Sequence, residues 1–489
     1  MDFSCLLLPF DRPMLLILFG LGTFLGIYVG AIPGLSATMA ISLLVSFTFG
    51  WDIYESVALM TGVYVGAVYG GSRSAVLLNI PGAPAAVVTG LDGYPLALKG
   101  QAGKAMATAA VQSVIGTLLG ALALLLLAPL ISKIALKFRS VDYLLLALTG
   151  LLTVGSLQGK SLSKSVFSAA FGLFLGCIGM DSLTAVKRFT LGITYLNSGV
   201  SFIVAMIGLF GVSEAFVQIS SEGRPVVKQQ VKNILPTFKE TIKFLPLTLK
   251  SAFIGVFTGA LPGAGGDIAA LLAYSAAKKT EKKPSAPFGE GAIEGVIAPE
   301  TANNAAIGGA FIPMLTLGIP GDSVTAIYIS ALMLAGLNPG PGFLESSPDI
   351  FMLIAAGLFI CAIFMLVFSL SGIRVFSYLT RIPSETLAPL ILILSALGAF
   401  AVNFSVTDVA WMFAFGIIGY LLRTRGYPMG PIVLGIVLEK LLETNLRRGL
   451  MLNGNVWRLF LSVFESPISI ILFIIMLGII APSLKRKRK

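Results

Sequence analysis

Long apolar runs, separated by short polar connections, make up most of the chain. The strongest runs lie at Met14–Ile32, Met106–Ile131, Val141–Leu157, Val200–Ile219, Ile350–Leu370, Val406–Leu422 and Ile468–Ile480. Their lengths approach the ~20 residues that a helix needs to cross the hydrocarbon core, and they are far longer than barrel strands. With the weaker segments included, the pattern predicts an all-α polytopic membrane protein with about a dozen transmembrane helices or half-spans.

One polar stretch, Ser220–Lys243, interrupts this pattern and is rich in lysine and arginine. It indicates a linker, expected on the cytoplasmic side by the positive-inside rule. The chain is therefore divided into an N-terminal transmembrane repeat (residues 1–219), a polar linker (220–245) and a C-terminal transmembrane repeat (246–489). The second repeat ends in the basic tail Lys485–Lys489, which is also expected in the cytoplasm.

The two halves share helix-breaking motifs in the same order. The corresponding segments are Gly30-Ala-Ile-Pro-Gly34 with Gly259-Ala-Leu-Pro-Gly263, and Asn79-Ile-Pro-Gly82 with Gly318-Ile-Pro-Gly321. A proline inside a helix costs about 3 kcal/mol. Membranes tolerate it where the freed backbone groups find partners or line a cavity. The duplication therefore predicts a transporter whose site lies at re-entrant or broken helices.

Charges around the first motif differ between the halves. Segment 247–277 is flanked by lysines at both ends, so both ends are expected in the cytoplasm, with a re-entrant hairpin or a pair of short helices between them. The corresponding flanks of the first half carry only Arg12 as a basic residue. Elements that enter from opposite faces predict an inverted-topology repeat, while basic loops on both sides of one strong span leave the full topology open.

Small residues also recur at a spacing of four. Gly22, Gly26, Gly30 and Gly34 correspond to Ser251, Gly255, Gly259 and Gly263, and Gly62, Gly66 and Gly70 correspond to Thr301, Ala305 and Gly309. Such residues share one helix face and let neighbouring backbones approach closely. The spacing predicts helix packing at these glycines.

Composition excludes several functional classes. Hydrophobic residues make up 56% of the chain and charged residues 12%, which leaves little room for a soluble domain. The net charge of +11 fits the positive-inside rule better than nucleic-acid binding. The chain has no histidine, which excludes His-ligated metals, His proton relays and Ser-His-Asp chemistry. Three cysteines provide no disulfide framework, and the first residues predict no removable signal peptide.

Arg73 is the candidate anion-binding residue. It is the sole charged residue between Glu55 and Asp92, and its planar fork can bind a carboxylate bidentately. A structural ion pair with an intramembrane acid is the alternative. The predicted substrate-binding set is Arg73 with Ser36, Ser72, Ser74, Asn79, Asn303 and Asn304, together with the half-helix N-termini after Gly34 and Gly82.

Asp267 and Asp322 are the candidate cation-binding residues, because each directly follows a glycine break. A carboxylate beside unwound backbone supplies hard oxygen ligands for Na⁺ or takes up a proton, and helix capping is the alternative role. Gly263, Gly265 and Gly321 complete this predicted cation-coupling site. For Glu300 and the neighbouring asparagines, helix–helix hydrogen bonding and a substrate or ion role both remain open.

Taken together, these motifs resemble the large integral membrane subunit of the tripartite tricarboxylate transporter family. Further matching segments are Asp92-Gly-Tyr-Pro95, Pro299-Glu300 and Leu317-Gly-Ile-Pro-Gly-Asp322, and the similarity covers essentially the whole chain. The resemblance implies a carrier of the bacterial inner membrane that imports tricarboxylates or related carboxylates with Na⁺ or H⁺. It also implies two partners, a small membrane subunit and a periplasmic solute-binding protein. No cofactor other than the coupling cation is expected.

Two other classes compete with a carrier. Asp267 and Asp322 could form the dyad of an intramembrane aspartyl protease, but Ala264-Gly-Gly precedes Asp267 where Gly-x-Gly would be required. An anion channel would need pore-lining rings of one charge sign, whereas the halves here differ in charge. The prediction is therefore a non-enzymatic carrier that works by alternating access.

Overall fold

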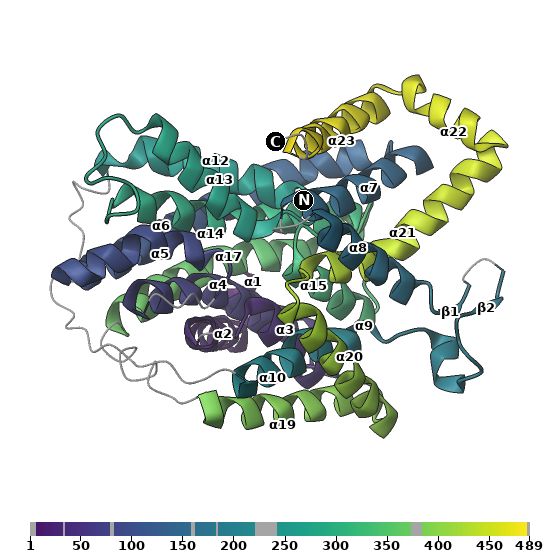
Figure 1. Ribbon diagram of the computed structural model, residues 1–489, viewed down its shortest axis with the longest axis horizontal. Coiled ribbons are helices and arrows are strands. Elements are labelled where there is room, and N and C mark those ends of the chain that lie inside the picture. The colour runs from purple at the N-terminus through teal and green to yellow at the C-terminus, as the bar shows by residue number, and fades with distance from the viewer. Residues whose placement is uncertain are drawn as a thin grey trace.

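The computed structural model describes residues 6–32, 35–78, 83–157, 162–181, 184–220, 242–372 and 384–486. These residues are mainly helical (Figure 1), which confirms the all-α class of membrane protein. The sheet among them is one short antiparallel pair, β1 (Gly179–Met180) with β2 (Lys187–Arg188). Most of the predicted linker, residues 221–241, lies outside the described residues.

The helices follow the apolar runs. In the first half they are α1 (Leu8–Asp11), α2 (Pro13–Ala31), α3 (Ala37–Phe47), α4 (Ile53–Leu78), α5 (Ala86–Leu96), η2 (Ala97–Gln101), α6 (Ala102–Ala135), α7 (Ser140–Leu157), α8 (Leu162–Gly176), η3 (Thr194–Ser198), α9 (Phe202–Met206), η4 (Ile207–Val212) and α10 (Ser213–Ser220). In the second half they are α12 (Leu245–Ala260), α13 (Gly265–Thr280), α14 (Glu294–Leu317), α15 (Ser323–Leu334), α16 (Phe343–Ser346), α17 (Pro348–Ser371), α19 (Ser384–Asn403), α20 (Val406–Thr424), α21 (Gly430–Asn453), α22 (Val456–Leu461), η5 (Ser462–Glu465) and α23 (Pro467–Arg486).

The halves begin with the same sequence of elements. The order α2, α3, α4, α5 in the first half matches α12, α13, α14, α15 in the second, with a break after the first helix and another after the third. The pair α12 and α13 is the pair of short helices that the sequence predicts around Pro262. Opposite orientation of the two repeats stays a prediction.

Four helical segments in the described part of the chain are long and apolar enough to cross a membrane. They are α2, the run Ala86–Ala135, α17 and α20, and the pair of Val456–Glu465 with Pro467–Gly478, bent by 106°, would make a fifth. Other apolar helices, α3, α12 and α15 among them, are shorter. The number of about a dozen spans and half-spans therefore stays a prediction.

Glycines hold the first long pair, α2 and α4, at backbone contact. A Cβ atom added at Gly66 would lie 2.3 Å from the carbonyl oxygen of Thr23, and one at Gly26 would lie 2.5 Å from that of Val63. The pair α12 and α14 repeats this contact, with 2.3 Å between a Cβ at Gly255 and the carbonyl oxygen of Ala302. The helix-packing prediction for these glycines is confirmed, because a methyl group has no room there.

Substitution of Gly66 by alanine should destabilise the protein by about 1–3 kcal/mol, because the added methyl forces α2 and α4 apart. Thermal unfolding of the purified protein in detergent measures this loss. Gly478→Ala is the matched control, since Gly478 lies in α23 and a methyl group added there would have nothing within 4 Å. A melting temperature as high in Gly66→Ala as in the control would contradict the packing role.

Helix α14 is the centre of the bundle. Each residue from Glu294 to Leu317 is buried, and glycines of two neighbours allow the close approach. A Cβ at Gly116 of α6 would lie 2.4 Å from the carbonyl oxygen of Thr301, and one at Gly259 of α12 would lie 2.3 Å from that of Ala306. Other parts of the protein therefore enclose α14 on all sides.

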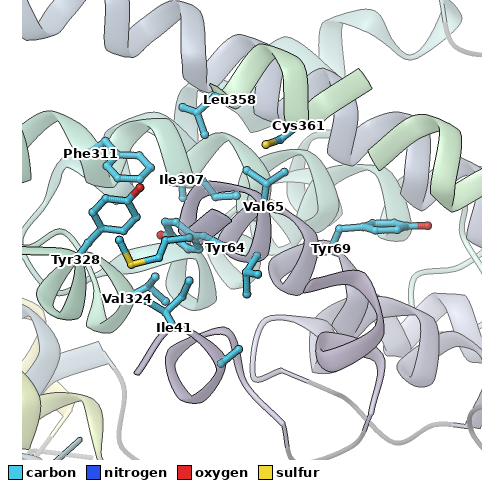
Figure 2. Packing of buried hydrophobic residues seen from close by; sticks show 14 of the residues in the cluster. Ile41, Tyr64, Val65, Tyr69, Ile307, Phe311, Val324, Tyr328, Leu358 and Cys361 are labelled. Carbon is cyan, nitrogen blue, oxygen red and sulfur yellow. The ribbon is translucent and has the colours of Figure 1, made fainter. Parts of the chain in front are cut away.

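Aromatic side chains pack against one another where the two halves meet. Figure 2 shows Tyr64 of α4 near Phe311 of α14, and Phe311 near Tyr328 of α15. The ring centroids are 5.8 Å apart in the first pair and 5.3 Å in the second, both edge-on. The Tyr328 hydroxyl lies 2.7 Å from the Thr61 hydroxyl on α4. The first half's long helix is thus fixed to the second half's broken pair.

Asp92 ties α5 to the segment that precedes α14. Its Oδ1 accepts hydrogen bonds from the backbone N–H groups of Gly289, Gly291 and Ala292 at 2.8–2.9 Å, and its Oδ2 accepts one from the Tyr274 hydroxyl at 2.8 Å. The carboxylate is fully buried, so these donors compensate its desolvation. This anchor holds α5, whose first residues line the cavity described next.

Candidate functional site

A cavity of about 870 Å³ lies where four helices begin. Its walls include the segments Ser36–Thr38 at the start of α3, Ala83–Ala85 before α5, Ala264–Asp267 at the start of α13 and Asp322–Val324 at the start of α15. These segments follow the four breaks predicted from the sequence. The structure therefore brings the segments that follow both motifs of both halves to one place.

Local sequence explains why helices begin at this cavity. Ser36 is the N-cap of α3 and its hydroxyl accepts from the Met39 N–H at 3.2 Å. Asp322 is the N-cap of α15, with Oδ1 accepting from the Thr325 N–H at 2.8 Å, in a reciprocal capping box. The capping role considered for Asp322 is thus present. Gly265 has φ of 61°, a value that glycine adopts without strain at the start of α13.

Asp267 of the second half forms a hydrogen bond with the first half. It lies in the first turn of α13, is exposed to the cavity, and its Oδ1 accepts a hydrogen bond from the Ala85 N–H at 3.0 Å. Ala85 directly precedes α5. The second half's acid therefore stabilises a helix N-terminus of the first half. Any change in the charge of Asp267 acts on both repeats.

The two acids share one wall of the cavity with an amide. A Cβ added at Gly265 would lie 2.9 Å from the Asp322 Cβ, and one at Gly266 would lie 2.2 Å from the Asn303 Oδ1. Asp322 also accepts a hydrogen bond from the Tyr64 hydroxyl. The structure thus brings together Asp267, Asp322, Asn303 and Gly265 of the predicted site. The aligned helix start in the first half places Ser36 at the same cavity.

The cavity lining also contains a cation that the sequence did not single out, Arg423. Arg423 lies in the last turn of α20 and lines the cavity together with Tyr427–Gly430, the segment that leads into the start of α21. The Arg423 guanidinium is 2.5 Å from the Glu214 carboxylate on α10. Its position at the end of an apolar run is also what the positive-inside rule expects, so the sequence offers no separate signal.

Other predicted residues lie away from the cavity lining. Arg73 is buried, with its Nε donating to the Tyr69 hydroxyl at 3.1 Å and a terminal nitrogen donating to the Ser369 carbonyl of α17 at 2.7 Å. The hydroxyls of Ser72 and Ser74 donate to carbonyls of their own helix. The anion-binding role of Arg73 stays a prediction.

The remaining predicted residues have a packing contact or lie outside the described residues. Gly321 packs closely against α12, because a Cβ atom added at Gly321 would lie 2.5 Å from the carbonyl oxygen of Gly259. Gly263 has φ of 76° in the break before α13. Asn304 donates its amide to the Glu300 carbonyl at 3.0 Å. Gly34, Asn79 and Gly82 lie outside the described residues.

Comparison with known proteins gives one consistent result. The sequence profile of the tripartite tricarboxylate transporter TctA family matches residues 16–434. An "uncharacterized 52.8 kDa protein in TAR-I ttuC' 3'region" of Agrobacterium vitis is 36% identical over 470 residues, 96% of this chain and 93% of that protein. A second Agrobacterium vitis protein, from the TAR-II ttuC' 3'region, is 37% identical over 236 residues, 48% of this chain and 97% of its own length. No solved structure matches the chain significantly.

Proposed function

The chain belongs to the tripartite tricarboxylate transporter TctA family, and we propose that its cavity binds a carboxylate substrate and a coupling cation during transport. It is an integral membrane subunit of a multi-subunit transporter. The family implies partner subunits, including a binding protein. The finer proposal is import across a bacterial inner membrane, driven by a Na⁺ or H⁺ gradient, with the basic tail in the cytoplasm.

The convergence of four helix N-termini at one cavity is the observation that carries this proposal. Each N-terminus presents backbone N–H groups and the positive end of a helix dipole, and both favour a bound carboxylate. Broken helices that meet at a repeat interface are the usual binding arrangement of secondary transporters. A volume of about 870 Å³ is ample for a small carboxylate.

Arg423 is proposed as the cavity's charged contact for the substrate. Its fork is suited to bidentate carboxylate binding, and it lines the cavity while Arg73 does not. Glu214 holds it in the structure. A substrate carboxylate would take over part of that ion pair, so binding changes the contact between α10 and α20.

Asp267 and Asp322 are proposed to bind the coupling cation. Carboxylate, amide and backbone oxygens are the hard ligands that alkali cations prefer, and Asn303 adds an amide beside the acids. The cation offsets the charge of the acids and of the substrate. Because Asp267 binds the Ala85 N–H, occupation of this site stabilises one arrangement of the two repeats over another.

Uptake of radiolabelled citrate tests this function. The full transporter, with its small subunit and binding protein, is reconstituted in proteoliposomes and assayed with an inward Na⁺ gradient, an inward H⁺ gradient or neither. Saturable uptake that needs one gradient is the expected result. Citrate flux that is linear in concentration and independent of both gradients would instead indicate a channel. If citrate is not taken up, other di- and tricarboxylates are assayed in the same vesicles, and failure with all of them would overturn the proposal.

A further inference from the structure

Glu300 is a buried carboxylate that the cavity does not use. It lies in α14, is 1% exposed, and is absent from the cavity lining. No ion pair in the described part of the chain involves Glu300. A carboxylate without a counter-charge at the centre of a membrane bundle is costly, and such residues generally carry function.

Hydroxyl groups from neighbouring helices surround this carboxylate. Thr89 of α5 donates to Oε1 at 2.5 Å, and Ser113 of α6 donates to Oε2 at 2.8 Å. Ser72 of α4 is the third hydroxyl beside the carboxylate, and its own proton is donated to the Tyr69 carbonyl at 2.7 Å. A hydroxyl can donate its proton to an ionised carboxylate or turn a lone pair toward a bound cation. These hydroxyls can therefore stabilise the ionised Glu300 carboxylate when no cation is bound, and they can contact a cation when one is bound.

A further oxygen lies one helical turn away. Asn304 is fully buried and its amide nitrogen donates to the Glu300 carbonyl at 3.0 Å, while its Oδ1 has no hydrogen-bond partner among the described residues. A buried amide oxygen without a donor is unusual and calls for an explanation. Among the described residues it is an acceptor without a donor, one helical turn from a carboxylate without a counter-charge.

Three charged side chains on the neighbouring helices have other partners. Asp92 of α5 binds the segment before α14, Asp267 of α13 faces the cavity, and Arg73 of α4 bonds to Tyr69 and to α17. The groups that face the Glu300 side chain are hydroxyls. Its charge therefore depends on what binds at this position, not on a neighbouring ion.

We propose that Glu300, with the hydroxyls of Thr89, Ser113 and Ser72, forms a second monovalent-cation site, for Na⁺ or a proton, separate from the acids in the cavity. The inference rests on the proposed function, since a second site matters for a cation-coupled carrier. The site joins α4, α5, α6 and α14, so its occupation would stabilise the packing of first-half helices around the central helix of the second half.

The test compares Glu300→Gln with Glu290→Gln, an exposed control that precedes α14. Purified transporter in detergent is melted at rising NaCl, with choline chloride holding ionic strength constant, and over a pH series without Na⁺. Direct ²²Na⁺ binding is measured on the same samples, with Asp267→Asn and the double variant alongside. These readouts need no transport, so they remain informative if citrate uptake fails.

If Glu300 binds Na⁺, Glu300→Gln should bind less ²²Na⁺ than the wild type. The double variant with Asp267→Asn should also lose the ²²Na⁺ that each single variant still binds. If Glu300 binds a proton, Glu300→Gln should bind as much ²²Na⁺ as the wild type. Its melting temperature should lose a dependence on pH that Glu290→Gln keeps. Glu300→Gln that matches the control in both series would overturn the proposal.

Hydroxyl variants keep the test valid if Glu300→Gln does not fold. Thr89→Val should weaken the apparent cation affinity about tenfold, because it removes a hydroxyl bonded to a charged group. Thr89→Ser restores the hydroxyl and should behave as the wild type. If the site binds Na⁺, the melting temperatures at rising NaCl give the affinity. If the site binds a proton, Thr89→Val should shift the midpoint of the pH series. Equal values for the two variants would assign Glu300 and its hydroxyls to helix packing alone.

Discussion

Gradient-driven carboxylate uptake should fall about 100-fold when Asp267 is replaced by asparagine, equivalent to ~2.7 kcal/mol of lost coupling. Asparagine retains an oxygen that can accept the Ala85 N–H now bound at 3.0 Å, so the α5 N-terminus keeps its cap. What disappears is the charge exposed to the cavity, which the proposed coupling cation would bind. Initial uptake rates in proteoliposomes, normalised to the amount of folded protein, measure the effect.

Asp11→Asn is the matched control for this variant, because Asp11 is an exposed acid at the end of α1 and is absent from the cavity lining. It should transport as the wild type does. If Asp267→Asn retains the full uptake rate and an unchanged dependence on the driving gradient, the assignment of the cation site to Asp267 is wrong. Loss of uptake with a normal melting temperature would separate coupling from folding.

Replacement of Arg423 by glutamine should raise the KM for citrate about 30-fold, equivalent to ~2 kcal/mol, because a charged hydrogen-bonded contact is lost. Lysine at this position should recover part of the affinity, since it keeps the charge but not the bidentate fork. Concentration series of radiolabelled citrate give KM for each variant under the same gradient.

Arg425→Gln is the control, two residues along the chain and outside the cavity lining. Arg423→Gln also leaves the Glu214 carboxylate without its partner at 2.5 Å, so reduced stability could mimic reduced binding. Glu214→Gln resolves this ambiguity, because it frees Arg423 for the substrate and should keep KM equal to or below the wild-type value. A KM in Arg423→Gln equal to that of Arg425→Gln would return the anion site to Arg73 as the leading candidate.

Repetition is the part of the site that could be predicted from the chain alone. Pro-Gly breaks at equivalent points of two halves indicated broken helices, and the structure has helices that begin directly after Ser36, Ala85, Ala264 and Asp322 around one cavity. The sequence also marked the glycine faces of α2 and α4, because small residues four apart must lie on one side of a helix. Both predictions depend on local geometry, which a single sequence encodes.

Side-chain direction over long distances could not be predicted in this way. Arg73 lies nine residues after Tyr64 on α4, and at 3.6 residues per turn this is two and a half turns. Tyr64 faces the cavity and Asp322, so Arg73 points to the other side and reaches α17. Which side faces the cavity is decided by how α4 packs, not by its composition.

The sequence by itself therefore determined the all-α membrane class and the positions of the helix breaks, because hydropathy, proline and glycine act locally, while the division into two related repeats stays its prediction. Only the tertiary structure decided which side chains meet. It placed Arg423 in the same cavity lining as the acids, connected Asp267 to the N-terminus of α5 in the other half, and enclosed Glu300 among hydroxyls of neighbouring helices. These contacts join residues far apart in the chain, and they form because the close packing around α14 leaves each side chain one direction in which to point.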